Sequence, residues 1–220
     1  MVILEDYQKT FNMNTFGGIV EGKTDYPIIN SVLIGYFNKH DIDIAWVQPQ
    51  NFRSQANYDK VFKSCKPAKL RQYLQINKYL IIHVDTDASA DFGVPHQENG
   101  ELLIPEKLVE KVVAKFRLEM GEDFYSQYSD RIIFAIAVHS IECWLFPLLD
   151  SDDKNSQTEN CFQILKQTVA NFRKNYEYYQ EITKKYHNSD DFLKLYPKNP
   201  SLKIFIEELA KRNIEIPEES

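Results

Sequence analysis

Hydrophobic positions along the first 150 residues follow two alternating patterns. Short apolar runs rich in β-branched residues occur at residues 16–20, 42–47, 78–85 and 131–138. Such runs are typical of strands, and a nearly continuous run predicts a strand that is buried on both faces of a parallel sheet. The segments between them repeat apolar residues at helical spacing, at residues 26–37, 58–76 and 105–120. The alternation predicts an α/β fold with a parallel sheet of about four strands flanked by helices.

The chain changes character after the last of these strands. Ser140 is a candidate N-cap for a helix that continues to residue 149. Residues 150–160 are polar and acidic, which predicts a linker or loop. Residues 161–187 and 201–213 have a helical pattern throughout. We therefore predict an α/β domain at residues 1–150, with a basic helical insertion at about 50–77, and a helical C-terminal extension at 151–220.

Composition and charge limit the functions open to this chain. The hydrophobic content of 43% is sufficient for a core. No stretch approaches the ~20 apolar residues of a membrane span, and the start lacks a signal peptide, so we expect a cytoplasmic protein without membrane association. The three cysteines, Cys65, Cys143 and Cys161, are widely spaced and odd in number, which predicts neither a disulfide framework nor a zinc site.

The net charge of −6 argues against a general nucleic-acid coat protein, which would be basic. It does not argue against an enzyme that acts on nucleic acid, because carboxylates that hold divalent cations also count as negative. Two groups of basic residues are interpreted as solvated helix faces. They are Lys60, Lys63, Lys66, Lys69 and Arg71 in the predicted insertion, and Arg173, Lys174, Lys184 and Lys185 near the C-terminus.

The stretch GGIVEGKT, residues 17–24, matches the phosphate-loop pattern G-x-x-x-x-G-K-[ST]. The match would make the protein a P-loop NTPase that binds a nucleotide through Lys23. However, Ile19 and its neighbouring valine favour a strand over a tight loop, and Glu21 would put a carboxylate into an anion site. Pro27 fits only the first turn of a helix that begins near Thr24 or the next residue. In that register residues 17–20 form a strand, and Glu21 is the first residue beyond it.

Acidic residues then follow the ends of three predicted strands. Glu21 and Asp25 follow the first strand, Asp85 and Asp87 end the third, and Glu142 follows the fourth. Because the carboxyl ends of parallel strands line the ligand crevice of such sheets, these side chains are expected to converge. Oxygen ligands without a Cys/His set point to Mg²⁺ or Mn²⁺. Considered alone, Asp25 is explained as well by a role as helix cap as by a role as metal ligand. Considered alone, Glu142 can also be explained as a residue of the first helical turn, where the helix dipole favours an acid.

These motifs resemble a known family. IVEGKTD, followed by a strand that ends in DTD and later by SIECWL, resembles the TOPRIM domain, a Rossmann-like fold, most closely in the OLD-like and small standalone TOPRIM nucleases of bacterial defence systems. The resemblance covers residues 16–150. It implies that Glu21, Asp85 and Asp87 are catalytic and bind metal, and that Asp25 and Glu142 are further metal ligands. The third acidic element, here Glu142, varies across the family.

The resemblance implies a Mg²⁺- or Mn²⁺-dependent nuclease that hydrolyses phosphodiester bonds in DNA or RNA, with a role in antiviral defence. Lys23 and His139 are expected to contact a substrate phosphate, whereas His83, in mid-strand, is interpreted as a satisfied core histidine. An ATPase or another defence protein is an expected partner, and a homo-oligomer is left open. Two alternatives remain: the P-loop NTPase, and a non-catalytic TOPRIM subunit that serves interaction or regulation.

Overall fold

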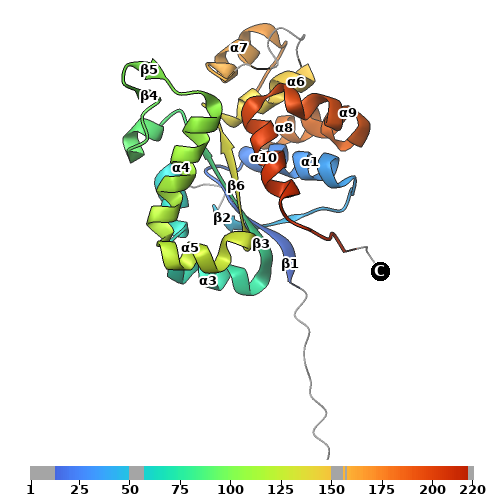
Figure 1. Cartoon of the computed structure of the whole chain (residues 1–220). Helices are drawn as coiled ribbons and strands as arrows, with labels where there is room; N and C mark the ends of the chain where they lie inside the picture. The colour runs from blue at the N-terminus through green and yellow to red at the C-terminus, as the bar shows by residue number, and fades with distance from the viewer. Residues whose placement is uncertain (1–12, 50–56, 150–155, 157, 218–220) are drawn as a thin grey trace, which may run out of the picture.

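The computed structural model describes residues 13–49, 57–149, 156 and 158–217. A sheet of four parallel strands lies at its centre (Figure 1), in the order β2-β1-β3-β6. The strands are β1 Asn14–Ile19, β2 Ile44–Gln48, β3 Asn77–Asp85 and β6 Ile132–Ala137. The predicted α/β class, the parallel sheet and all four predicted strands are confirmed. Since the strands are parallel, their carboxyl ends lie at one edge of the sheet.

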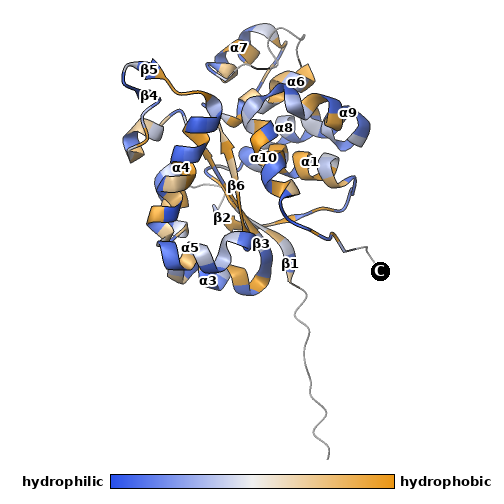
Figure 2. Ribbon diagram, viewed as in Figure 1, coloured by the Kyte–Doolittle hydropathy of each residue, from blue (hydrophilic) through white to orange (hydrophobic). Residues whose placement is uncertain are grey.

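Helices cover both faces of this sheet, as expected for a buried parallel sheet. One face is covered by α2 Tyr58–Ser64, α3 Pro67–Ile76, α4 Pro105–Met120 and α5 Glu122–Tyr128. The other is covered by α1 Asp25–Phe37, the 3₁₀ helix η3 Ile141–Leu145, α6 Phe146–Leu149, α7 Cys161–Thr168, α8 Tyr176–Ile182, the 3₁₀ helix η5 Thr183–His187, α9 Ser189–Leu195 and α10 Pro200–Ala210. In Figure 2 β2 and β6 are largely hydrophobic, whereas the helices alternate in colour along their length, as amphipathic helices do.

The C-terminal helices pack closely on α1. The Ser31 hydroxyl lies 2.8 Å from the Thr183 hydroxyl, and Trp144 Nε1 donates a hydrogen bond of 2.9 Å to Ser201 Oγ. Gly35 faces the backbone of η5 so closely that an added Cβ would lie 2.1 Å from Tyr186 O. The described residues after 158 therefore share one core with α1 and η3. The domain boundary predicted at residue 150, and most of the predicted linker, lie outside the described residues.

Residues 58–76 are helical, as predicted, and form two helices, because Pro67 has no backbone N–H to donate and begins a new helix. Several other local predictions were wrong. Residues 97–102 form a small hairpin, β4 Gln97–Glu98 and β5 Glu101–Leu102, and α5 was not predicted. Residues 161–187 are not helical throughout, since 169–175 separate α7 from α8. The segment after Ser140 begins as 3₁₀ rather than α-helix, and the Ser140 side chain makes no capping hydrogen bond.

The expectation that no disulfide forms was also wrong. Cys143 of η3 and Cys161 of α7 form a disulfide, while Cys65 is buried with a free thiol. The pair is separated by 18 residues, and only the fold brings the two side chains together. Among the described residues, the helices are all too short or too polar to cross a membrane.

Two arginines fix the amino ends of β3 and β6. Arg131 Nη2 donates to Leu74 O at 2.7 Å and to Asn77 O at 2.8 Å. Arg212, just beyond α10, donates from Nη2 to Ile132 O at 2.6 Å. These charge-assisted hydrogen bonds join α3, β3, β6 and the end of the last helix at one edge of the sheet. The acidic residues lie at the opposite edge.

Candidate functional site at the carboxyl ends of the strands

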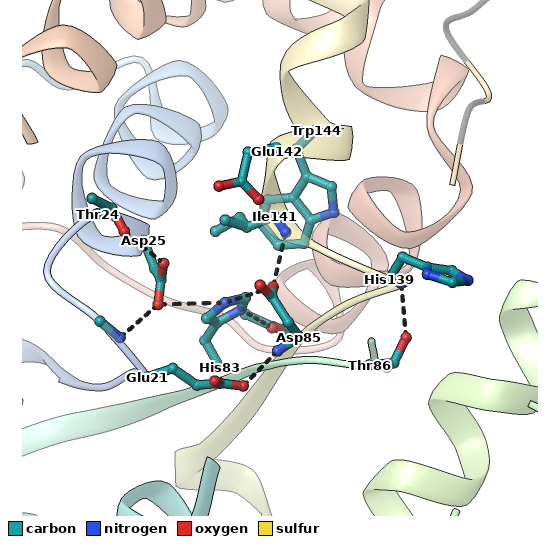
Figure 3. A network of polar contacts seen from close by, with 12 residues as sticks. Glu21, Thr24, Asp25, His83, Asp85, Thr86, His139, Ile141, Glu142 and Trp144 are labelled. Atoms are coloured by element: carbon teal, nitrogen blue, oxygen red, sulfur yellow. Dashed lines mark hydrogen bonds and ion pairs between the residues drawn. The ribbon is translucent and has the colours of Figure 1, made fainter. Parts of the chain in front are cut away.

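The segment between β1 and α1 has the register predicted from Pro27. β1 ends at Ile19, α1 begins at Asp25, and Pro27 lies in the first helical turn. The N-cap residue Thr24 makes no capping hydrogen bond through its side chain. Instead, Asp25 Oδ2 accepts a hydrogen bond of 2.8 Å from Gly22 N (Figure 3). The amide of Gly22, which a phosphate loop would turn towards a nucleotide, is therefore used within the turn.

The first two glycines of GGIVEGKT have a packing role. Gly17 and Gly18 lie within β1, paired with β2 and β3 on either side. A Cβ on Gly17 would lie 2.7 Å from Asn77 Cγ, so only glycine fits this close approach between strands. The close packing around Gly17 thus explains a glycine at this position without any phosphate.

Three carboxylates lie near one another at the carboxyl ends of β1 and β3, and a backbone amide orients each of them. Glu21 Oε1 accepts from Asp85 N at 2.9 Å, and Asp85 Oδ1 accepts from Ile141 N at 2.8 Å. Asp25 is oriented by Gly22, as described above. Figure 3 shows the three side chains around the ring of His83. The predicted convergence of these three residues is therefore observed, with one oxygen of each carboxylate held by the main chain.

His83 belongs to this cluster. The prediction that it is a core histidine is confirmed, but the prediction that its polar atoms are satisfied is wrong for Nε2. The ring is fully buried, and Nδ1 lies 2.6 Å from Ala135 O. Nε2 lies 3.4 Å from Asp85 Oδ1 and 3.8 Å from Asp25 Oδ2, and it has no hydrogen-bond partner among the described residues. The signal in the sequence was the spacing: His83 precedes Asp85 by two residues, which places both on one face of the strand.

Burial dominates the electrostatics of the cluster. Burial, followed by the Asp85 carboxylate, raises the pKa of Glu21 to about 8. Burial also raises the pKa of Asp85 to about 7 and raises that of Asp25, although His83 opposes both shifts. For His83 burial lowers the pKa, but Asp85 and Asp25 outweigh burial and raise it to about 9. The cluster therefore attracts positive charge, whether as protons or as a cation.

Glu142 lies beside this cluster but is bound by residues of the C-terminal part. Its side chain is fully buried in η3, and Oε1 lies 2.7 Å from Lys174 Nζ and accepts a hydrogen bond of 3.0 Å from the Tyr179 hydroxyl. Burial acts to raise the pKa of Glu142, but Lys174 outweighs burial and lowers it. The interpretation of Lys174 as part of a solvated face missed this ion pair, because no local pattern links residues that only the fold brings together.

We expect Lys174→Met to lower the melting temperature most at neutral and alkaline pH. In the wild type the pKa of Glu142 lies below its ordinary value of 4.5, so the pair stabilises the fold above that pH and loses its effect as acid protonates the folded carboxylate. Without Lys174 the buried carboxylate has no counter-charge and destabilises the fold as the pH rises. Thermal unfolding between pH 8 and pH 4.5 should show the gap between variant and wild type narrowing as the pH falls.

Lys184→Met is the matched control, because Lys184 pairs with the exposed Glu181 and such surface pairs contribute little. A gap for Lys174→Met that is the same at every pH, or no larger than that of the control, would contradict the role given to Lys174.

The remaining predicted site residues lie further out. Asp87 is exposed beyond the end of β3, and its backbone N donates to His139 O at 2.9 Å. His139 has a positive φ of 56°, and its Nε2 lies 3.6 Å from Glu159 Oε1. Lys23 is exposed on the turn before α1. The structure thus groups Glu21, Asp25 and Asp85 with His83, places Glu142 next to them, and leaves the others at the rim.

The basic stripe of the predicted insertion is partly engaged with neighbouring helices. Lys66 pairs with Glu119 of α4, and the guanidinium of Arg71 lies 5.1 Å from the centre of the Phe124 ring of α5. Residues 50–56 of the insertion lie outside the described residues.

The donor set fits a divalent cation in charge and chemistry. In the described ranges, no three His, Cys, Asp or Glu side chains already meet around a common point as metal ligands do. Nevertheless, carboxylate oxygens suit Mg²⁺ or Mn²⁺, and a cation would balance the charge of ionised carboxylates whose pKa values are raised mainly by burial and further by their acidic neighbours. Glu21, Asp25 and Asp85 are the residues able to hold such an ion.

Comparison with known proteins adds no family to this picture. Neither a family model, nor a curated protein, nor a solved structure matches the chain. The assignments made above therefore depend on the residues themselves.

Proposed function

We propose that this protein is a Mg²⁺- or Mn²⁺-dependent nuclease that hydrolyses phosphodiester bonds in nucleic acid. One observation carries the proposal: three carboxylates with raised pKa values, one buried and two partly buried, lie together at the carboxyl ends of the strands of a parallel sheet. The TOPRIM-like order of the motifs supports the same reading. A role in anti-phage defence and an ATPase partner follow from that resemblance alone.

In this proposal each residue has a defined task. Glu21, Asp25 and Asp85 would hold the cation, and Glu142 would add negative charge next to them. The chemistry that a bound cation supplies is Lewis-acid activation of the scissile phosphate and of an attacking water. Glu21 Oε2 would be the atom that binds the cation or that accepts the proton of an attacking water, since Oε1 already accepts from the Asp85 amide. Lys23 and His139, which lie at the rim, would contact phosphates of the substrate.

Cleavage assays with purified protein test the proposal directly. Plasmid DNA, linear DNA and tRNA are each incubated with Mn²⁺, with Mg²⁺ and with EDTA. We expect at least one substrate to be cut when either metal is present and none to be cut in EDTA. Cleavage that survives EDTA, or no cleavage of any substrate with either metal, would count against a metal-dependent nuclease.

Nucleotide binding distinguishes the P-loop alternative. We expect no tight binding of ATP or GTP, because the Gly22 amide is occupied by Asp25 and the glycines before it lie in β1. Tight binding that Lys23→Ala abolishes would favour an NTPase instead. Metal binding without any cleavage would favour the non-catalytic subunit.

A further inference from the structure

The ring of His83 is oriented as in a metal-binding histidine. Nδ1 lies 2.6 Å from Ala135 O, and since a carbonyl oxygen only accepts, Nδ1 carries the proton of this hydrogen bond. Ala135 is the residue paired with His83 between β3 and β6, so the sheet itself supplies the partner. Histidines that bind metals nearly always donate their second ring N–H to a carbonyl or carboxylate in this way. The free nitrogen is then Nε2.

Nε2 points into the acidic cluster and lacks a partner of its own. The ring is completely buried, and Nε2 has no hydrogen-bond partner among the described residues. It lies 3.4 Å from Asp85 Oδ1 and 3.8 Å from Asp25 Oδ2. Trp144 lies on another side of the ring, with 6.3 Å between ring centres. A neutral ring would direct its lone pair at two carboxylates, which is unfavourable unless a cation lies between them.

We propose that His83 Nε2 is a ligand of the cation held by Glu21, Asp25 and Asp85, and that the site therefore prefers a first-row transition metal to Mg²⁺. The inference rests on the metal site of the proposed function and names its ligand set more closely. Imidazole nitrogen suits transition metals, whereas Mg²⁺ favours oxygen ligands and water. The sequence interpretation, which used carboxylates alone, did not discriminate between Mg²⁺ and Mn²⁺.

The rival role for His83 is that of an imidazolium whose positive charge holds Asp25 and Asp85 together without any metal. Both roles use the same contacts, but they differ in what they predict for a bound Mn²⁺ ion. Mn²⁺ transfers unpaired spin density to a nitrogen that coordinates it, whereas it transfers none to an imidazolium that only pairs with the carboxylates. Pulsed electron paramagnetic resonance of the Mn²⁺-loaded protein separates the two.

The experiment uses the full chain, with one equivalent of Mn²⁺, prepared once with natural histidine and once with ¹⁵N-labelled histidine. We expect ¹⁴N modulation of the Mn²⁺ signal in the first sample and its replacement by ¹⁵N modulation in the second. This comparison needs no substitution and so does not depend on whether a variant folds. Bound Mn²⁺ without histidine modulation, or no Mn²⁺ binding, would overturn the proposal.

Two variants complete the test. His83→Gln should lose the modulation and bind Mn²⁺ at least about tenfold more weakly, with a smaller loss for Mg²⁺. His40→Gln, at an exposed position after α1, should keep both the modulation and the affinity. Equal losses for the two metals in His83→Gln would contradict the proposed preference.

The role proposed for His83 and the proposed nuclease activity can be refuted independently of each other. Histidine modulation in a protein that cuts no nucleic acid would leave the metal site intact and refute only the nuclease. Metal-dependent cleavage with Mn²⁺ bound and no histidine modulation would refute only the role of His83.

Discussion

Replacing Glu21 by glutamine is expected to lower metal-dependent cleavage by about a hundredfold or more, while the metal-free protein becomes no less stable than wild type. Glutamine keeps the size of the side chain and an oxygen that accepts from Asp85 N, so the local geometry is retained. It removes the negative charge that would hold the cation and accept the proton. It also removes a carboxylate whose raised pKa reflects burial and repulsion by Asp85.

Thermal unfolding and cleavage should be measured on the same preparations. In EDTA the melting temperature of Glu21→Gln should equal or exceed that of wild type, and added Mn²⁺ should raise the wild-type value more, because only the wild type keeps the full ligand set. Glu110→Gln is the matched control, since Glu110 is exposed on α4 and pairs with Lys107. Full cleavage activity in both Glu21→Gln and Asp85→Asn would remove the proposed site.

Gly35→Ala is expected to be the most destabilising of the single substitutions considered, by about 3 kcal/mol or more. The new methyl group would lie 2.1 Å from Tyr186 O and 2.8 Å from Phe192 Cγ. The first contact is with backbone, which cannot turn away as a side chain does, so η5 would have to separate from α1. For a chain of this size, each kcal/mol lowers the melting temperature by about 2–4 °C.

Gly18→Ala provides the comparison, because the same methyl group would there meet Ile44 Cγ2 at 3.0 Å, the end of a side chain that can adjust. Its melting temperature should fall much less. A melting temperature for Gly35→Ala close to that of wild type would mean that η5 and α9 do not pack on α1 as described.

The strands and the acidic edge were predictable because their signals are local. Buried parallel strands give continuous apolar runs, and all four were found in this way. Pro27 indicates the register of α1, and that register places Glu21 just beyond β1. Asp25 and Asp85 then followed from the rule that the strand ends of a parallel sheet share one edge.

The features that could not be predicted from the sequence depend on contacts between distant parts of the chain. The ion pair of Lys174 with Glu142 joins the segment between α7 and α8 to η3, and only the fold brings these two parts of the chain together. The Cys143–Cys161 disulfide has the same origin. His83 is a different case, because its spacing from Asp85 was visible, but a histidine in a buried strand has no local mark that tells a ligand from a core residue.

The difference between the two ends of the strands affects which substitutions the fold can accept during evolution. Arg131 and Arg212 hold the amino ends of the strands with hydrogen bonds to main-chain carbonyls, whereas the carboxyl ends carry acids that repel one another. Neutral replacements at the acidic edge relieve that repulsion and leave the arginine-held edge untouched. A folded descendant that lacks the proposed catalytic chemistry would therefore lie a single substitution away, and it would be available for selection as a binding module.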